Sequence, residues 1–305
     1  MSGVVGGWWR QARVGVTVVS MLTVAACSAA GAGTPTATGT PAPKPVLHPV
    51  SWTWQPKAPR SFVPQGVTRA GDRLFITGYR WAASRADQYC RVMVIDTTTA
   101  TTLAEASELR ADGAVCHHGG GVAYSRAGLW IAGSGRLWLV DPAHPGLVRR
   151  SWKVDPGMRA STLAISRGQL WLGKYSAHGR GRLGQVSIRG LLAPGVTALA
   201  RRGGPSIAAV AVRPAPNFIQ GIGIDRRGLW LSRSSTRCGD LIRAHGGHRR
   251  LIPGAEGVLL VGRHRAWVVS ESGSPHYQSL GGRPDTPMLS FVDLNQLTAG
   301  RCFSG

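Results

Sequence analysis

Residues 120–133, GGVAYSRAGLWIAG, contain two short runs of alternating side chains separated by a tight turn. The first run covers Val122–Ser125, residues 126–128 supply the turn, and the second run carries Trp130. A period of two residues is typical of β-strands, and a Gly-containing turn between two such runs indicates a β-hairpin. This stretch therefore predicts one β-hairpin with an aromatic residue in its second strand.

The same hairpin pattern occurs five times along the chain. Successive copies start 36 to 59 residues apart, at residues 65, 120, 161, 220 and 256. A third strand-like segment follows each hairpin, and the first two copies also have a fourth. Repeats of four antiparallel strands are typical of propeller blades. The sequence thus predicts an all-β fold, a β-propeller of five four-stranded blades, with six blades as the alternative because residues 206–214, SIAAVAVRP, form an extra strand candidate.

The last repeat lacks a clear fourth strand, and an unassigned strand-like segment precedes the first repeat. This segment, PVSWTWQPK at residues 49–57, resembles the fourth strand of the second repeat, VRRSWKVDP at residues 148–156. An open ring would leave unpaired strand edges. We therefore expect the N-terminal strand to complete the last blade.

The N-terminus has the features of an export signal. Arg10 and Arg13 precede the apolar run at residues 14–26, which ends in the residues VAAC. The run resembles the lipobox of bacterial lipoproteins, which implies cleavage before Cys27 and attachment of a lipid, with acyl chains such as palmitate, to Cys27. An ordinary signal peptide and an uncleaved anchor helix are the alternatives.

These features divide the chain into three parts: a lipoprotein signal peptide at residues 1–26, a lipidated Cys27 with a Pro/Thr/Gly-rich tether at residues 27–47, and a β-propeller domain at residues 48–305. The tether has no large apolar side chains before Val46 with which to form a core, so we expect it to be disordered. We expect the protein to be anchored to the cell membrane by its lipid, on the extracytoplasmic side.

The chain has a formal net charge of +22, and its arginines occur in every segment. Nucleic-acid-binding domains concentrate basic residues on one helix or arm, and no helix-turn-helix, zinc-finger or RNP-like pattern is present. We therefore expect no nucleic-acid partner. For an exported protein the anionic partners would be lipid headgroups, a cell-wall polymer, a glycan or another protein.

The first strand of each blade lines the central channel of a propeller, so the residues that start these strands should meet at one channel mouth. His118, just before the second repeat, and Glu271, after the last hairpin, should reach the same rim. The candidate ligand-binding or catalytic residues at this mouth are Gln65, His118, Ser161, Gln220, Glu256 and Glu271.

The sequence Cys116-His117-His118 could mark a metal or nucleophile site. However, adjacent side chains on an extended strand point to opposite sides, so both histidines cannot easily bind one ion. Of the five cysteines, four remain once Cys27 carries the lipid, and an even number in an exported protein favours disulfides. Up-and-down strand order puts Cys90 and Cys116 on one face, which leaves Cys238 to pair with Cys302.

The segments PQGVT, HGGGVA, AEGV and VSESGSPHY resemble those of uncharacterised secreted propeller proteins of actinobacteria, which implies a location and a fold. The step Glu256-Gly257 also resembles the propeller lactonases of the gluconolactonase and senescence-marker type. That resemblance implies that Glu256 binds a divalent cation, Ca²⁺ or Zn²⁺, although matching Asn and Asp residues are absent from the other repeats.

Two functions fit these observations. The first is a lipoprotein that binds a cell-envelope ligand or partner through its channel mouth. The alternative is a metal-dependent hydrolase of lactones or esters, with Glu256 as metal ligand or base. We favour the first, because a fold does not imply catalysis and the aligned strand starts contain one acid.

Overall fold

The structure is a computed structural model that describes residues 49–54, 61–243, 246–286 and 288–303. Every described residue belongs to one compact unit, Lys44–Gly305, which is the second of the two units of the chain. The expected signal peptide, the lipidation site Cys27 and the tether to residue 47 lie outside the described residues. In the described part of the chain, no helix is both long and apolar enough to cross a membrane.

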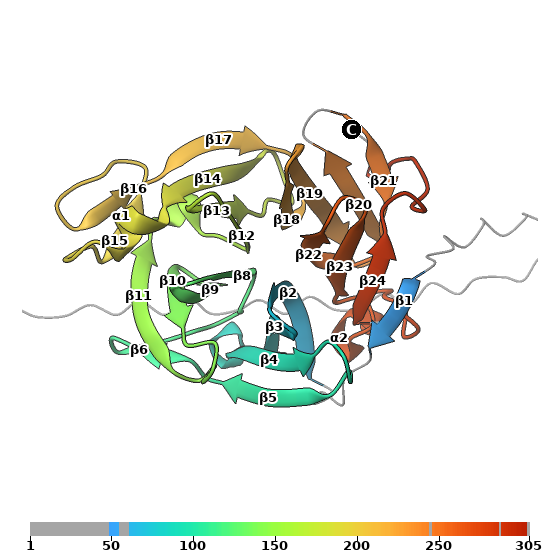
Figure 1. Ribbon diagram of the computed structural model, residues 1–305, viewed down its shortest axis with the longest axis horizontal. Coiled ribbons are helices and arrows are strands. Elements are labelled where there is room, and N and C mark those ends of the chain that lie inside the picture. The colour runs from blue at the N-terminus through green and yellow to red at the C-terminus, as the bar shows by residue number, and fades with distance from the viewer. Residues whose placement is uncertain (1–48, 55–60, 244–245, 287, 304–305) are drawn as a thin grey trace, which may run out of the picture. The chain divides into compact units, whose positions relative to one another are not determined.

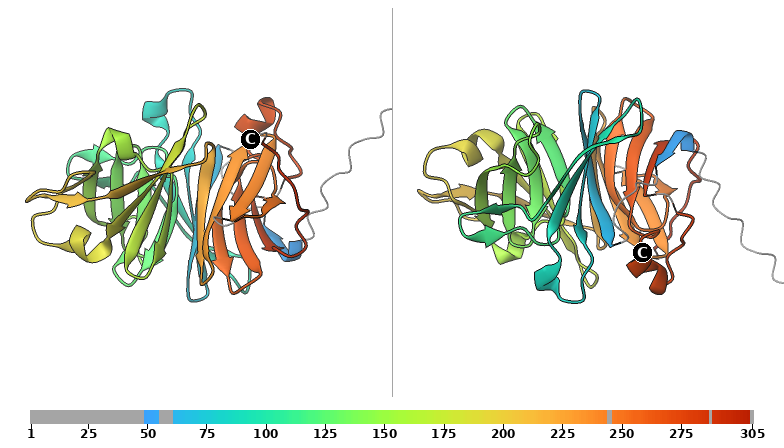
Figure 2. Two further views of the ribbon diagram at one scale, coloured as in Figure 1. Left: turned by 90° about the horizontal axis from the view of Figure 1, so that it is seen from above. Right: turned by 90° about the horizontal axis from the view of Figure 1, so that it is seen from below.

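The second unit is an all-β propeller, in which sheets are arranged around a central axis (Figure 1). Its strands run between the two faces of the ring (Figure 2). Four of the sheets have four strands, in the order β1-β24-β23-β22, β2-β3-β4-β5, β12-β13-β14-β17 and β18-β19-β20-β21. Their bounds are β1 (Pro49–Trp54), β2 (Phe62–Ala70), β3 (Arg73–Arg80), β4 (Cys90–Asp96), β5 (Thr102–Ser107), β12 (Thr162–Ser166), β13 (Gln169–Lys174), β14 (Gly181–Ser187), β17 (Ala211–Ala215), β18 (Ile219–Asp225), β19 (Gly228–Ser235), β20 (Cys238–Arg243), β21 (His248–Arg250), β22 (Ala255–Val261), β23 (Arg265–Ser270) and β24 (Leu289–Asp293).

The remaining sector of the ring contains a six-stranded sheet. Its order is β16-β15-β11-β10-β9-β8, where β8 is Val122–Ser125, β9 Gly128–Gly133, β10 Arg136–Val140, β11 Val148–Val154, β15 Ala198–Ala200 and β16 Ile207–Ala209. A short β6 (Arg110–Ala111) and β7 (Ala114–Val115) form a separate hairpin, and the helical segments are α1 (Ile188–Leu192), α2 (Pro275–Ser279), η1 (Arg85–Asp87) and η2 (Pro156–Met158).

The prediction of five, or six, four-stranded blades is therefore wrong, since the described residues form four such blades and one larger sheet. The extra strand candidate at residues 206–214 does not found a blade of its own. Its first half contains β16, which pairs in parallel with β15, and β15 in turn pairs in parallel with β11 of the six-stranded sheet. Its second half lies in β17, which is the outer strand beside β14.

The predicted ring closure is confirmed by the pairing of β1 with β24. The two strands are antiparallel, with Thr53 opposite Ser290 and Trp54 opposite Leu289. The N-terminal strand thus becomes the outer strand of the sheet that the C-terminal repeat begins. This pairing covers the edge of β24 that the last repeat would otherwise leave open.

The inner hairpins follow from their turn residues. In the β12–β13 hairpin, Ser166 pairs with Gln169, and the two residues between them have positive φ angles, 50° at Arg167 and 71° at Gly168. Two such residues make the type I′ turn that suits the twist of a β-hairpin. In the β8–β9 hairpin, the repeat's aromatic residue bonds across the turn, because Trp130 Nε1 donates to Ser125 Oγ at 2.8 Å.

Both predicted disulfides are confirmed. Cys90 pairs with Cys116 and Cys238 with Cys302, with Cα atoms 5.3 Å and 5.6 Å apart. The first disulfide is fully buried in a core shared by the first two repeats, where it packs among Phe75, Leu129 and Trp138. Cys116 is therefore part of the core and not of a metal or nucleophile site.

The inner strands are the first strands of the five repeats, β2, β8, β12, β18 and β22. In three of them a β-bulge followed by a glycine lies within the first few residues of the strand. The pairing register shifts at Gln65 in β2, at Gln220 in β18 and at Glu256 in β22. A bulged residue leaves the regular pairing, and its side chain can be re-aimed. The residue that follows each bulge is a glycine, and these glycines lie against the neighbouring inner strand.

At Gly257 the contact with the neighbouring strand is especially close. A Cβ atom added there would lie 2.8 Å from Gly66 Cα and 2.9 Å from Val67 N, which are backbone atoms of β2. Backbone atoms cannot move aside as the end of a flexible side chain can. The glycine after the bulge is thus required for the inner strands of the last and first repeats to meet.

We expect Gly257→Ala to lower the free energy of unfolding by about 1–3 kcal/mol, as overpacking of a close contact does. Chemical denaturation measures the change. Gly190→Ala in α1 is the matched control, since the nearest atom to an added Cβ there is 3.7 Å away. Equal stability of the two variants would contradict this account of the inner strands.

Candidate functional site

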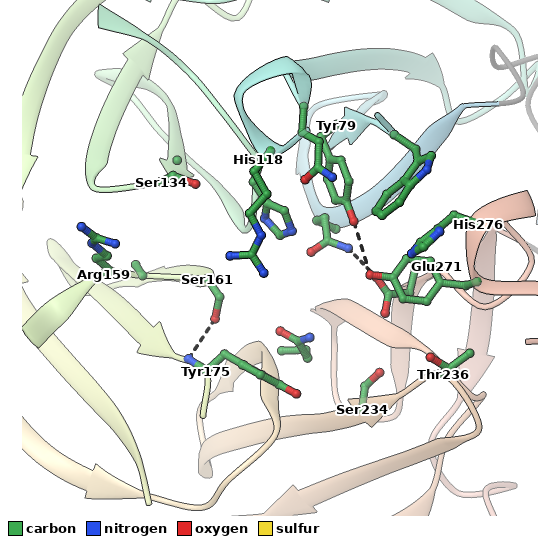
Figure 3. A pocket seen from close by; sticks show the side chains of 18 of the residues that line it. Tyr79, His118, Ser134, Arg159, Ser161, Tyr175, Ser234, Thr236, Glu271 and His276 are labelled. Carbon is green, nitrogen blue, oxygen red and sulfur yellow. Dashed lines mark hydrogen bonds between the residues drawn. The ribbon is translucent and has the colours of Figure 1, made fainter. Parts of the chain in front are cut away.

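One cavity occupies the mouth of the central channel at the face where the inner strands begin and the second strands end. Its volume is about 670 Å³. Figure 3 shows that polar and aromatic side chains point into it from several blades. We call it the channel-mouth cavity. Its lining includes Gln65, Tyr79, Trp81, Arg85, His118, Ser134, Arg159, Ser161, Lys174, Tyr175, Gln220, Thr236, Glu271, His276 and Tyr277.

The structure brings the six candidate residues of the sequence analysis together. Five of them line the channel-mouth cavity: Gln65, His118, Ser161, Gln220 and Glu271. The sixth, Glu256, is 1% exposed and accepts a hydrogen bond from Ser234, a lining residue, with Ser234 Oγ 3.2 Å from Glu256 Oε1. Glu256 therefore lies in the wall behind the cavity surface.

Two buried carboxyl groups form the electrostatic centre of the site. Glu256 and Glu271 are hydrogen-bonded to each other, and Glu271 is 5% exposed. The Gln65 amide donates from Nε2 to Glu271 Oε2 at 2.8 Å, and Gln220 bonds to Glu256. Each bulged glutamine thus holds one member of the pair in place.

Burial and the short separation change the acidity of the pair. Burial raises the pKa of Glu271 to about 7. Burial, followed by the like charge of Glu271, raises the pKa of Glu256 well above its usual range. Two carboxylates in contact cannot both ionise easily, so they share a proton. Near pH 7 the pair can therefore both donate and accept hydrogen bonds.

Two tyrosines extend this network across the cavity. Tyr277 bonds to Glu271, and its hydroxyl lies 3.3 Å from the hydroxyl of Tyr79. Burial raises the pKa of both tyrosines, so their hydroxyl groups stay protonated. Tyr79 comes from the end of β3, whereas Tyr277 comes from α2. The network thereby joins two parts of the chain that are far apart in sequence.

His118 reaches the cavity because of its backbone conformation. Its φ is 50°, a value that turns the chain just before the β8 strand, and its ring stacks on Tyr79 with centroids 4.3 Å apart. Burial lowers the pKa of His118 to about 4, so the imidazole is neutral at pH 7. A neutral ring can donate from one nitrogen and accept at the other. Trp81, two residues after Tyr79, stacks on His276.

Basic side chains line another part of the cavity. Arg85, Arg159 and Lys174 are lining residues, and Figure 3 shows Arg159 across the cavity from Glu271. Within the described residues none of these three takes part in an ion pair. The cavity therefore holds both a proton-sharing acid pair and basic groups without an ion-pair partner, of which Arg85 lies near His118 and Tyr79 and Arg159 lies across from Glu271.

The described side chains around Glu256 do not supply the ligands that the expected divalent cation would need. Among the described residues, no group of three or more His, Cys, Asp or Glu side chains could hold a metal ion. Glu256, the residue expected to bind it, is instead bonded to Glu271, Ser234 and Gln220. The two carboxylates would need further oxygen ligands to form a calcium site.

Sequence reasoning missed the tyrosines and the basic side of the cavity. It considered the residues that start the inner strands, but the second strands end at the same face. Tyr79 lies at the end of β3, the second strand of its repeat. Tyr175 directly follows Lys174, the last residue of β13. Reading the ends of the second strands together with the starts of the first would have found these residues. Tyr277 and Arg85 lie in short helical insertions that the repeat does not contain.

No protein-family model and no curated protein sequence matches this chain. Among solved structures, it is similar to the GH43_1 enzyme from Xanthomonas citri complexed with xylose, at 10% identity over 84% of this chain and 93% of that chain, with a TM-score of 0.48. It is also similar to the Pan2 WD40 domain of Neurospora crassa, at 10% identity over 72% and 76%, with a TM-score of 0.41. A europium-containing methanol dehydrogenase matches at 14% identity, with a TM-score of 0.29, over 45% of this chain and only 25% of that chain.

The acid pair should make stability depend on pH. The folded protein holds a proton on Glu271 up to about pH 7, whereas an unfolded chain releases it near the ordinary value of 4.5. The free energy of unfolding should therefore fall as pH rises from 4.5 to 7, by about 3 kcal/mol for this group. Denaturation of the parent and of Glu271→Gln at pH 5 and pH 8 measures the effect. Parallel pH dependence in the two proteins would contradict the raised pKa.

Proposed function

We propose that this protein is a lipid-anchored extracytoplasmic propeller that binds a carboxylate-bearing saccharide of the cell envelope in its channel-mouth cavity. The observation that carries the proposal is the two-sided chemistry of that cavity. A hydroxyl-binding network centred on Glu256 and Glu271 faces unpaired basic side chains. Uronic acids and similar acidic sugars present hydroxyl groups and a carboxylate on one small ring.

The hydroxyl-binding side suits a polyol. The shared proton of the acid pair, the amides of Gln65 and Gln220 and the hydroxyl of Tyr277 supply both donors and acceptors. Saccharide hydroxyls also donate and accept, so they can satisfy groups of either kind. Gln65 and Tyr277 are already bonded to Glu271, so a saccharide hydroxyl would share or exchange these existing hydrogen bonds.

The basic side and the aromatic rings fit the rest of such a ligand. Arg85, Arg159 and Lys174 could meet a carboxylate, and an arginine can bind it with two parallel hydrogen bonds. Tyr175 remains 36% exposed although it lines the cavity, which leaves part of its ring free to pack on the apolar face of a sugar. The volume of about 670 Å³ is within the range of small-molecule sites.

The same geometry favours binding over hydrolysis. Two carboxyl groups that cleave a glycoside stand about 5 Å or more apart, so that the sugar or a water molecule fits between them. Glu256 and Glu271 instead bond to each other. Ser161 Oγ donates to Gly173 O and accepts from Tyr175 N, both at 3.1 Å. Its hydroxyl is therefore engaged with the backbone and not with a histidine base.

Calorimetric titration tests the ligand class. We expect a uronic-acid disaccharide to bind, and its neutral counterpart, in which the carboxylate is reduced to an alcohol, to bind at least about tenfold more weakly, as the loss of one charge-assisted contact predicts. Arg159→Gln should remove this preference. Arg189→Gln, on the exposed surface of α1, should keep it. Equal binding of the two disaccharides would refute the acidic ligand. Turnover of a lactone or ester that requires added Ca²⁺ or Zn²⁺ would favour the hydrolase instead.

Membrane anchorage has a separate test at the N-terminus. We expect Cys27→Ser to move the protein from the membrane fraction to the soluble fraction of the producing cell, because a serine cannot form the thioether to the lipid. Ser28→Ala is the matched control and should leave the fractionation unchanged. A Cys27→Ser protein that stays in the membrane fraction would argue for an uncleaved anchor instead.

A further inference from the structure

Arginines crowd one side of the face opposite the channel-mouth cavity. The inner strands run from the cavity to this face, so the turns that follow β12, β18 and β22 all lie there. These turns carry Arg167, Arg226, Arg227 and Arg263, and all four are exposed. In Figure 1 the three inner strands are neighbours around the axis.

The four arginines line one cavity of about 570 Å³, which we call the arginine cavity. Apolar side chains of Ile224 and Leu260 also contribute to its lining. Arginine guanidinium groups bind phosphates with parallel hydrogen bonds and are weakly hydrated for cations. Four of them around one hollow form a site for a multiply charged phosphate-bearing group.

Little within the protein neutralises this charge. Asp225 is the acidic residue in the lining, and its carboxylate accepts hydrogen bonds from Arg227 N at 2.7 Å and Trp230 Nε1 at 3.2 Å. Within the described residues none of the four arginines forms an ion pair. Their mutual repulsion is therefore relieved only by solvent ions or by an anionic partner.

The direction of β1 shows from which face the chain enters the propeller. β24 runs from the cavity face to the arginine face, because it is antiparallel to β23, which is antiparallel to β22. β1 is antiparallel to β24, with Pro49 opposite Val292 and Trp54 opposite Leu289. The start of β1 thus lies at the arginine face. Whatever holds the N-terminal part of the chain is connected to the propeller on that side.

We propose that the arginine cavity docks onto the phosphate headgroups of an anionic membrane. The charge of the cavity supplies the attraction, and because the chain enters the propeller on the same face, the arginine face can meet a membrane that holds the N-terminus without the tether passing around the propeller. Only the orientation rests on the proposed anchorage at Cys27, and the attraction of the cavity for phosphate groups does not depend on it. Docking in this way leaves the channel-mouth cavity facing away from the membrane and open to ligands.

Co-sedimentation with vesicles tests the docking. The full chain carrying Cys27→Ser, which cannot receive the lipid, is mixed with vesicles of phosphatidylcholine alone or with 30% phosphatidylglycerol. The apolar N-terminal run is present in every sample, so the ratio of binding to the two vesicle types isolates the effect of charge. We expect stronger binding to the anionic vesicles, and a loss of this preference at 0.5 M salt.

Matched fourfold variants separate the arginine cavity from net charge. Changing Arg167, Arg226, Arg227 and Arg263 to Gln should weaken binding to anionic vesicles at least tenfold, since each basic residue at such a membrane contributes roughly fivefold. The control changes four exposed arginines of the opposite face to Gln, namely Arg80, Arg180, Arg237 and Arg283. It removes the same charge and should retain most of the binding.

Equal losses in the two fourfold variants would overturn the proposal, because net charge alone would then explain the attraction. So would equal binding to both vesicle types. Tight, arginine-dependent binding of soluble polyphosphate without binding to vesicles would also overturn it, in favour of a soluble polyanion. Saccharide titrations of the same variants keep the two proposals apart, since the arginine-cavity variant should bind the acidic disaccharide as the parent does.

Discussion

The structure depends on how closely the inner strands can approach the channel axis. Each inner strand must pass another backbone at a distance that leaves no room for a side chain. A Cβ at Gly66 would lie 2.7 Å from Val122 N, and one at Gly221 would lie 2.8 Å from Glu256 O. Glycine at these positions therefore allows the ring to close. The bulge before each of these glycines is the local adjustment that accompanies the close approach.

The site follows from the same constraint. A bulge frees the residue before the glycine from the regular alternation, and this residue is a glutamine in two blades and Glu256 in a third. Where the inner strands approach one another, side-chain hydroxyl groups of the second strands donate to backbone carbonyl groups. Thr77 Oγ1 donates to Gly120 O at 2.6 Å, and Ser232 Oγ donates to Ala255 O at 2.5 Å. These backbone carbonyl groups thus have hydrogen-bond partners within the protein. Of the side chains at the bulges, those of Gln65 and Gln220 line the cavity, whereas that of Glu256 lies behind its surface.

The repeat made much of this arrangement predictable. Aligning the five hairpins on their aromatic residues placed Gln65, Gln220 and Glu256 at equivalent positions, and the cysteine positions predicted both disulfides. The six-stranded sheet was not predictable in this way. Its outer strands β15 and β16 follow α1, within a long insertion between β14 and β17. β15 pairs in parallel with β11 of an earlier repeat, and β16 pairs in parallel with β15. No local periodicity encodes a pairing between segments so far apart.

The acid pair shows a second limit of sequence reasoning. Both glutamates were candidates, but their sequence positions say nothing of whether the side chains touch. Contact changes their chemistry, because two separated carboxylates would be anions at pH 7, whereas two bonded and buried ones retain a proton. The difference arises from a few ångströms of side-chain placement. It decides whether the channel mouth repels or accepts the hydroxyl and carboxylate groups of an acidic sugar.

The channel-mouth cavity and the arginine cavity lie at opposite ends of the same inner strands, so the acid pair and the four arginines are separated by the length of these strands. Residues that start these strands supply amides and acids, and the turns that end them supply arginines. An anionic sugar and an anionic membrane would otherwise compete for one basic surface. With the acid pair present only at the channel mouth, hydroxyl-rich ligands gain partners there that the arginine cavity does not offer. A membrane surface, which cannot enter a narrow channel mouth, can still meet exposed turns. Under the two proposals, the fold would let one strongly basic protein distinguish two kinds of anion by shape and by hydrogen bonding instead of by charge alone.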